Sequence, residues 1–521
     1  MNNNVRKWWA LGAISLAVII VGMSMTILNV ALPTLATKLH ASASQLQLFS
    51  ASFTLVLTVG LLIGGLFGDQ FGRKKMLLIG LVIFGAGSLA SGFASSPAFL
   101  IAGQAMLGLG AAFIIPMSMS VLTVLFTDKE RPLAVSIWAA LSFISLPVGP
   151  ILGGWLLSNY WWGWVFLVNV PIVVLDIIAV IVLFPESRSV KRLRFDPLGI
   201  LTAIAGFVGL IYGFIQAGKK GWGDTGSLSL IIASLVVLVV FILWERWFSK
   251  RPNSQPAVDP SLFRSASYTW GTILVAIAFF TFYSILYVAP QYFQAIQATD
   301  ALGSGLRLLP LIAGLMVGAI LSQQIASGIG RNITVAAGFV LMAIGLFIGA
   351  NTTVTSINAF IVAWMAVFGL GIGLILATGS SAALEELSAE QSGAGSAVMQ
   401  MFQRAAGIIG VAILGSILNS TYRGQLNLVG IPSDAADSAK QSVFAGLQVA
   451  QKIGSKLLAE SAQTSFTHGM DLMLWVCGGV AIVGVILSLF FLPKWSDDTY
   501  IDEITTQPVL EEIYIDEREE K

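Results

Sequence analysis

Long apolar runs separated by short polar links dominate the sequence. The runs Phe49–Phe67 and Met76–Phe93 contain no charged residue, whereas the link between them, GGLFGDQFGRKK at Gly64–Lys75, contains one acid and three bases. An uncharged apolar run of this length is typical of a transmembrane helix. Gly68 and Gly72 favour a tight turn in the link, because glycine adopts backbone angles that other residues resist.

Fourteen such runs follow one another, which predicts an all-α polytopic membrane protein with fourteen transmembrane helices. An even number of spans places both termini on the same side of the membrane. The expected spans are Trp8–Leu32, Phe49–Phe67, Met76–Phe93, Phe99–Leu125, Leu133–Leu157, Trp164–Phe184, Leu198–Ala217, Leu228–Phe248, Thr269–Tyr292, Leu306–Ile325, Ile333–Ala350, Ile357–Leu376, Val398–Leu418 and Leu472–Leu492.

The Lys and Arg residues indicate the orientation of these spans. The links on the Arg73 side and the short flanks carry sixteen bases; the links on the opposite side carry three, or seven with one long loop included. Because cytoplasmic links are enriched in Lys and Arg, we expect the Arg73 side and both termini in the cytoplasm. This explains the basic excess of the links without a nucleic-acid partner.

The composition argues against several classes of protein. Of the 521 residues, 56% are hydrophobic and 11% are charged, far from the values of a soluble domain. The single cysteine, Cys477, excludes a disulfide framework, and His40 and His468 show no metal-ligand spacing, so we expect neither a metal nor a cofactor. The sequence contains no Walker-type phosphate loop and no cluster suited to an active site, so we expect neither direct drive by ATP nor an enzyme.

The runs group into four parts. These are an N-terminal six-helix bundle at 1–185, two inserted spans with their linkers at 186–267, a C-terminal six-helix bundle at 268–495 and an acidic cytoplasmic tail at 496–521. The C-terminal bundle includes an outside loop at 421–468, where a helix can begin at Pro432 and the apolar positions from Val443 to Leu457 follow helical spacing. We interpret this loop as an amphipathic hairpin on the outer surface.

The two bundles carry a weak repeat. The link after the tenth span, ASGIGRNI, contains Gly330 and Arg331 where the link after the second span contains Gly72 and Arg73. Both links follow the second span of a six-span block. Repeated bundles are typical of transporters that rock about a central site.

These features resemble the major facilitator superfamily, and within it the fourteen-span drug:proton antiporters of the EmrB/QacA type. Besides the link Gly64–Lys75, the resemblance rests on TILNVALP in the first span, GPILGG in the fifth, WGW and NVP at the start of the sixth and the segment around Arg404. It covers nearly all of residues 8–495. It implies a major facilitator fold, with two six-helix bundles and two inserted spans.

The resemblance assigns roles to two groups of residues. In the link Gly64–Lys75, Asp69 and Arg73 would latch the cytoplasmic gate beside Gly65 and Gly72. The alternative is a link that only sets the orientation of the spans in the membrane. In the fifth span, a face of small residues would form the family's antiporter motif, although it also suits plain helix packing. The motif residues are Gly149, Pro150, Gly153 and Gly154.

The chain departs from the family at positions linked to protons. Ser24 stands where members often carry an acid, and Gln104 where they carry an arginine. Asp176 is the only acid near the middle of an expected span, and it should face a wet cavity, pair with a base or be protonated. The two candidate glutamates also suit an interfacial position. The candidates for proton coupling are Asp176, Arg404, Glu385 and Glu386.

Polar amides and aromatic rings within the spans are candidates for lining a substrate cavity. They are Asn29, Gln104, Trp138, Phe143, Gln291, Gln294 and Gln403. The resemblance implies an efflux transporter in the cytoplasmic membrane of a bacterium, surrounded by lipid, that exchanges lipophilic or amphiphilic compounds for protons; we expect a monomer. The alternatives are a dedicated exporter of one native metabolite, lipid precursor or peptide, and a receptor without transport.

Overall fold

The regular structure of the protein is helical throughout its described part. The structure is a computed structural model that describes residues 3–126, 130–184, 196–250, 260–385 and 389–494. The apolar runs form helices because a membrane offers the backbone no hydrogen-bond partner, so each N–H and C=O must bond within its own segment.

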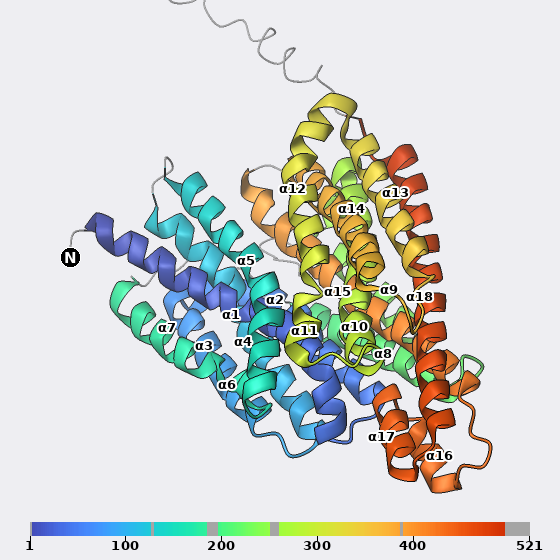
Figure 1. The fold of residues 1–521 in the computed structure, drawn as a ribbon. Coiled ribbons are helices and arrows are strands. Elements are labelled where there is room, and N and C mark those ends of the chain that lie inside the picture. The colour runs from blue at the N-terminus through green and yellow to red at the C-terminus, as the bar shows by residue number, and fades with distance from the viewer. Residues whose placement is uncertain (1–2, 127–129, 185–195, 251–259, 386–388, 495–521) are drawn as a thin grey trace, which may run out of the picture.

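Two bundles and an inserted helix pair make up the fold (Figure 1). The first bundle contains α1 (Asn3–Lys38), α2 (Ala43–Phe71), α3 (Arg73–Gly92), α4 (Pro97–Leu125), α5 (Arg131–Asn159), α6 (Trp164–Leu167) and α7 (Asn169–Leu183). The inserted pair is α8 (Pro197–Lys220) and α9 (Thr225–Phe248). After the short η1 (Pro260–Arg264), the second bundle contains α10 (Ala266–Ala295), α11 (Ala301–Leu306), α12 (Leu309–Ile329), α13 (Arg331–Gly349), α14 (Asn358–Glu385), α15 (Ala389–Gln425), α16 (Ser433–Ala439), α17 (Val443–Ile453) and α18 (Lys456–Phe491).

The number of spans is close to the expected fourteen. Thirteen segments of the described chain are helical, long and apolar enough to cross a membrane. The remaining expected span, Leu133–Leu157, coincides with α5, which has 29 residues. The all-helical fold class is therefore confirmed, and fourteen is an approximate count of its spans.

Some helix boundaries differ from the expected spans. Trp164–Phe184 is divided into α6 and α7, because Pro171 has no N–H to bond the carbonyl four residues earlier. The main helix of the tenth span, α12, begins at Leu309, after the separate α11, with Pro310 in its first turn. The expected outside loop, 421–468, contains the ends of α15 and α18 together with α16 and α17.

The two bundles meet at one end of the molecule and diverge toward the other (Figure 1). We call the end that carries α11, α16 and α17 the hairpin end, and the end that carries Gly72 and Gly330 the link end. Between the bundles, α2 packs against α15, α1 against α10 and α5 against α11. The inserted α8 lies along the contact of α2 with α15, where Ile211 packs with Ala51 and Ala412.

The links at Gly72 and Gly330 share one geometry. Each glycine ends one helix and begins the next, with φ of 108° and 91° respectively. Each donates its N–H to the carbonyl four residues earlier, that of Gly68 at 3.1 Å and that of Ala326 at 3.0 Å. L side chains rarely adopt such positive φ values. The structure therefore supports the repeat seen in the sequence.

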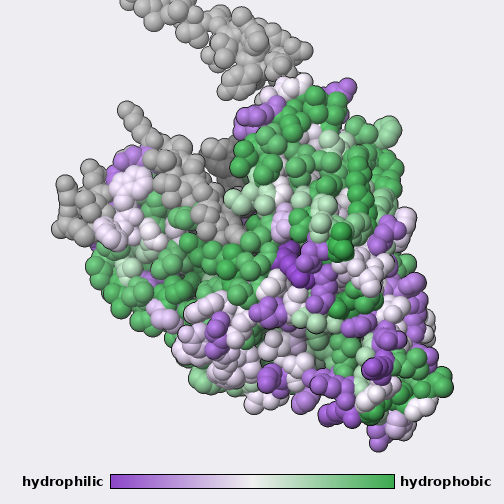
Figure 2. Space-filling model, viewed as in Figure 1, coloured by the Kyte–Doolittle hydropathy of each residue, from purple (hydrophilic) through white to green (hydrophobic). Residues whose placement is uncertain are grey.

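The outer faces of the bundles are apolar. Figure 2 shows hydrophobic side chains along the helices of the second bundle and over parts of the first. Large exposed side chains on α7, α9, α12 and α18 include Val182, Ile232, Ile320 and Phe490. Apolar surface of this extent suits lipid rather than water, so the chain is a multi-pass membrane protein.

Candidate functional site

A central cavity lies between the two bundles. It has a volume of about 210 Å³ and is lined by α1, α4 and α5 of the first bundle and by α10, α12, α14 and α15 of the second. Aliphatic lining residues come from both sides, among them Val18, Ile115 and Leu315. Substrate sites of transporters built from repeated bundles lie at such an interface.

Aromatic rings form part of the cavity wall. α10 contributes Phe279, Phe282 and Tyr283, which share one helix face. The rings of Phe279 and Tyr283 are stacked with centroids 5.7 Å apart, and those of Phe279 and Phe282 meet edge to face at 6.1 Å. From α5, Trp138 donates its Nε1–H to Ser118 Oγ at 3.2 Å, which holds the indole in place at the wall.

The polar part of the wall comes mainly from α15. Gln400, Gln403 and Arg404 lie one turn apart on the same face of this helix. Arg404 Nη1 donates to Met25 Sδ at 3.3 Å, so this contact spans the two bundles. Arginine stays protonated in proteins. Arg404 therefore places a fixed positive charge in a mainly apolar cavity, and we find no acid among its described lining residues.

The predicted cavity residues fall at several places. Trp138 and Gln403 line the central cavity, whereas the side chain of Phe143 lies outside the described part of the structure. Gln294 joins the bundles near the hairpin end, where its Nε2 donates to the Val30 carbonyl at 3.1 Å. Gln294 thus belongs to the contact that separates the cavity from the hairpin end.

The other three candidates bond within their own bundle. Asn29 and Gln291 each donate to a carbonyl one turn earlier in the same helix, at 3.4 and 2.9 Å. Gln104 donates to Ser91 Oγ at 3.4 Å, between α4 and α3. Each of these amides has a hydrogen-bond partner within the protein, and none is part of the described cavity lining.

The glycines of GPILGG face two different helices. A Cβ on Gly149 would lie 2.8 Å from the Met23 carbonyl oxygen on α1, and Gly153 packs on α1 as well. A Cβ on Gly154 would instead lie 2.5 Å from Leu302 Cα on α11, in the other bundle. The motif therefore packs α5 within its own bundle and also lets the two bundles approach each other.

Two cations bond the end of α7: Lys74 of the link Gly64–Lys75 and Arg6 near the start of α1. Lys74 Nζ donates to two carbonyls at this end, at 2.8 and 2.9 Å, and Arg6 donates to two more, each at 3.0 Å. Cations at a helix C-terminus satisfy carbonyls that lack a helical partner, a role that was not predicted from the sequence. Arg73 begins α3, while the surroundings of Gly65 and Asp69 lie outside the described part.

Asp176 is buried in the first bundle, away from the central cavity. It is 1% exposed, on the face of α7 that packs against α1 and α3. Its Oδ2 has no hydrogen-bond partner among the described residues. An ionised carboxylate is costly at such a position. Of the other coupling candidates, Glu386 and the side chain of Glu385 lie outside the described part.

A second acid inside a long apolar helix was not predicted. Because α18 begins at Lys456 rather than at Leu472, Asp471, which directly precedes the expected span, lies within a continuous helix. Asp471 Oδ1 is buried and has no partner among the described residues. The signal was present, because Phe466 and Met470 continue the apolar helical spacing upstream of the expected span.

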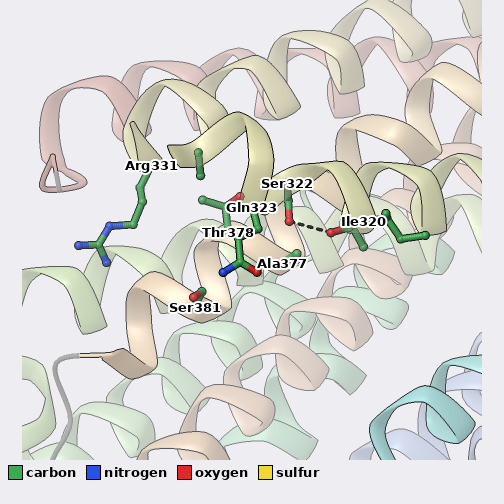
Figure 3. Close-up of a pocket in the computed structure, with 9 residues that line it drawn as sticks. Ile320, Ser322, Gln323, Arg331, Ala377, Thr378 and Ser381 are labelled. Carbon is green, nitrogen blue, oxygen red and sulfur yellow. Dashed lines mark hydrogen bonds between the residues drawn. The ribbon is translucent and has the colours of Figure 1, made fainter. Parts of the chain in front are cut away.

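A second cavity lies at the link end, within the second bundle (Figure 3). It has a volume of about 360 Å³ and lies between α12 and α14, beside the start of α13. Arg331, the counterpart of Arg73 in the repeat, contributes to its lining from the start of α13. Its polar lining residues are Ser322, Gln323, Arg331, Thr378 and Ser381.

Two membrane-spanning bundles about a shared cavity are the typical architecture of transporters built from repeats. The sequence model of the Major Facilitator Superfamily matches residues 14–411. The chain belongs to this superfamily, as the sequence motifs predicted.

Known proteins similar to this chain include drug and antibiotic resistance transporters. The Tetracenomycin C resistance and export protein of Streptomyces glaucescens is 29% identical over 93% of this chain and 91% of its own. The multidrug efflux pump LfrA of Mycolicibacterium smegmatis is 28% identical over 92% of this chain and 96% of its own. A bacterial homologue of the human lysosomal transporter Spinster shares the fold, with a TM-score of 0.68, 15% identity and coverage of 94% of this chain and 99% of that chain.

Proposed function

We propose that the protein exports lipophilic or amphiphilic small molecules across the cytoplasmic membrane in exchange for protons. The observation that carries this proposal is the cavity of apolar and aromatic side chains shared by both bundles. The names of the relatives, which refer to export and drug resistance, point the same way. Export of one native metabolite, lipid precursor or peptide is the alternative, favoured by the relative named for a single compound.

We infer that the link end and both termini face the cytoplasm. The sixteen bases on that side support this. With this orientation, the contact of the bundles at the hairpin end corresponds to an inward-facing state. Tags after Lys521 and within Arg188–Asp196 should be protected from an impermeant reagent in intact cells, and a tag at Ser438 should react. A reactive C-terminal tag would contradict the orientation.

In the opposite state the bundles would meet at the link end. Asp69 and Arg73 lie there, and a charged pair beside helix ends would stabilise one of the two states. Asp176 is the first candidate for carrying the proton, followed by Glu385 and Glu386. Arg404 contributes a constant charge rather than a proton, because a guanidinium does not titrate.

Everted membrane vesicles provide the test of export. They should accumulate several members of a panel of neutral and charged dyes and antibiotics, and an uncoupler should abolish this uptake. Trp138→Ala should change which compounds are moved, whereas Arg246→Gln, exposed on α9, should not. Uptake of no compound would contradict export, uptake that resists the uncoupler would contradict proton exchange, and uptake of one compound would favour the alternative.

A further inference from the structure

The charge of the central cavity bears on the class of substrate. Within its described lining, the one side chain with a fixed charge is Arg404. We propose that the cavity selects amphiphilic organic anions, whose acidic group binds Arg404 while an aromatic part packs on the rings of α10. This rests on the export function proposed above and names the substrate class of that same site.

The Arg404 guanidinium has hydrogen-bonding capacity to spare. Its five N–H groups form a rigid fork that matches a carboxylate or a sulfonate. Among the described residues, its hydrogen-bond acceptor is Met25 Sδ, 3.3 Å from Nη1, and a thioether is a weak acceptor. An oxyanion in place of this sulfur forms charge-assisted hydrogen bonds, which are about twice as strong as neutral ones.

The aromatic part of the site lies next to this charge. A Cβ on Gly407, one turn after Arg404 on α15, would lie 2.7 Å from ring atom Cδ2 of Tyr283. Tyr283 in turn stacks on Phe279. Phe279, Tyr283 and Arg404 all line the cavity, so a flat aromatic group can pack on the rings from inside it while its acidic substituent reaches the guanidinium.

The same features select against cations. A lipophilic cation in the cavity meets Arg404 in mainly apolar surroundings, where like charges repel more strongly than in water. Gln400 and Gln403 supply amide dipoles but no neutralising charge. Repulsion of cations by Arg404 thus adds to its attraction of anions, and specific sites often combine the two effects.

Fluorescein and rhodamine 123 test the proposal, because they share a three-ring xanthene skeleton and carry opposite charges at mildly alkaline pH. Binding of each dye to the purified full-length protein in lipid nanodiscs is measured by fluorescence polarisation. The variants are Arg404→Gln, Arg404→Lys and Arg404→Glu. Arg246→Gln, which removes an exposed arginine of α9, is the matched control.

We expect the wild type and the control to bind fluorescein more tightly than rhodamine 123. Arg404→Gln should weaken fluorescein binding about tenfold or more, the usual effect of losing a hydrogen bond to a charged group. Arg404→Lys should restore part of this loss, and Arg404→Glu should reverse the preference. Equal binding of both dyes by the wild type, or an equal loss of both in Arg404→Gln, overturns the proposal. The wild-type comparison decides the matter where a variant fails to fold.

Failure of this proposal differs from failure of the export function. Vesicles that move neutral or cationic dyes while the protein neither binds nor moves fluorescein refute the anion preference and leave export intact. Vesicles that move no dye, with a protein that binds fluorescein through Arg404, refute export alone.

Discussion

Replacing Gly154 by alanine should open the protein at its hairpin end. The added Cβ would lie 2.5 Å from Leu302 Cα and 2.7 Å from the Ala301 carbonyl oxygen, whereas ordinary contacts begin at 3.4 Å, so α11 must retreat by about 1 Å. Overpacking of this kind costs about 1–3 kcal/mol. The cost arises only when the bundles meet at this end, while the helix propensity of alanine acts in both states. The equilibrium should therefore shift about 5- to 150-fold toward the state in which the bundles are separated at the hairpin end.

A cysteine in the cavity reports on this shift. Ser145 lines the cavity, and Ser145→Cys changes the side chain little. The natural Cys477 is fully buried, so we expect little labelling of the protein without the added cysteine. In intact cells, an impermeant maleimide should label the Ser145→Cys protein slowly, and labelling should accelerate when Gly154→Ala is added.

Two further glycines serve as controls. Gly479→Ala places its Cβ where nothing lies within 4 Å, so it should leave the labelling rate unchanged. Gly149→Ala crowds α1 within the first bundle, so it should lower the amount of folded protein without faster labelling. Labelling of the Gly154→Ala protein at the control rate, with normal amounts in the membrane, would refute the role given to the α5–α11 contact.

The remaining predictions concern the gate and the proton. Asp69→Ala or Arg73→Ala should leave the protein in the membrane but cut vesicle uptake severely, because losing one charge biases one state by about 1–3 kcal/mol; near-normal uptake would leave the link with its orienting role only. Asp176→Asn should keep substrate binding but lose proton-driven efflux of a neutral dye, measured as proton release in proteoliposomes. Unchanged proton release would exclude Asp176 as the residue that carries the proton and leave Glu385 and Glu386 as the candidates.

The spans could be predicted from the sequence more reliably than the lengths of their helices. The length of an apolar run matches the thickness of the hydrocarbon core that the segment crosses. The helix can extend beyond the run for as long as its backbone hydrogen bonds continue. α18 shows the difference, because its apolar run was expected from Leu472 and the helix begins at Lys456. The turn at Gly72 was predictable because glycine is needed at its positive φ.

The residues that face the cavity were harder to predict. Transmembrane helices are apolar on most sides, so hydrophobic periodicity does not show which face turns inward. Gln403 lines the cavity and Gln104 bonds Ser91 inside the first bundle, although both are glutamines within apolar runs. A charged side chain within a span must face the protein interior, yet Arg404 lines the cavity and Asp176 is buried inside the first bundle, so charge did not show which of them faces the cavity.

The departures from the family bear on the energy that drives transport. Where members often carry an acid and a base, Ser24 accepts a hydrogen bond from Asn169 at 3.1 Å and Gln104 donates to Ser91 at 3.4 Å, so both positions are neutral and bonded within the first bundle. An organic anion that leaves a cell with a negative interior gains about 2.3 kcal/mol per charge for each 100 mV, or about 50-fold in concentration. An anionic substrate therefore needs no proton for its export, whereas a neutral one does. On this reasoning, Asp176→Asn should lose efflux of neutral compounds and keep efflux of anions for as long as the membrane potential is maintained.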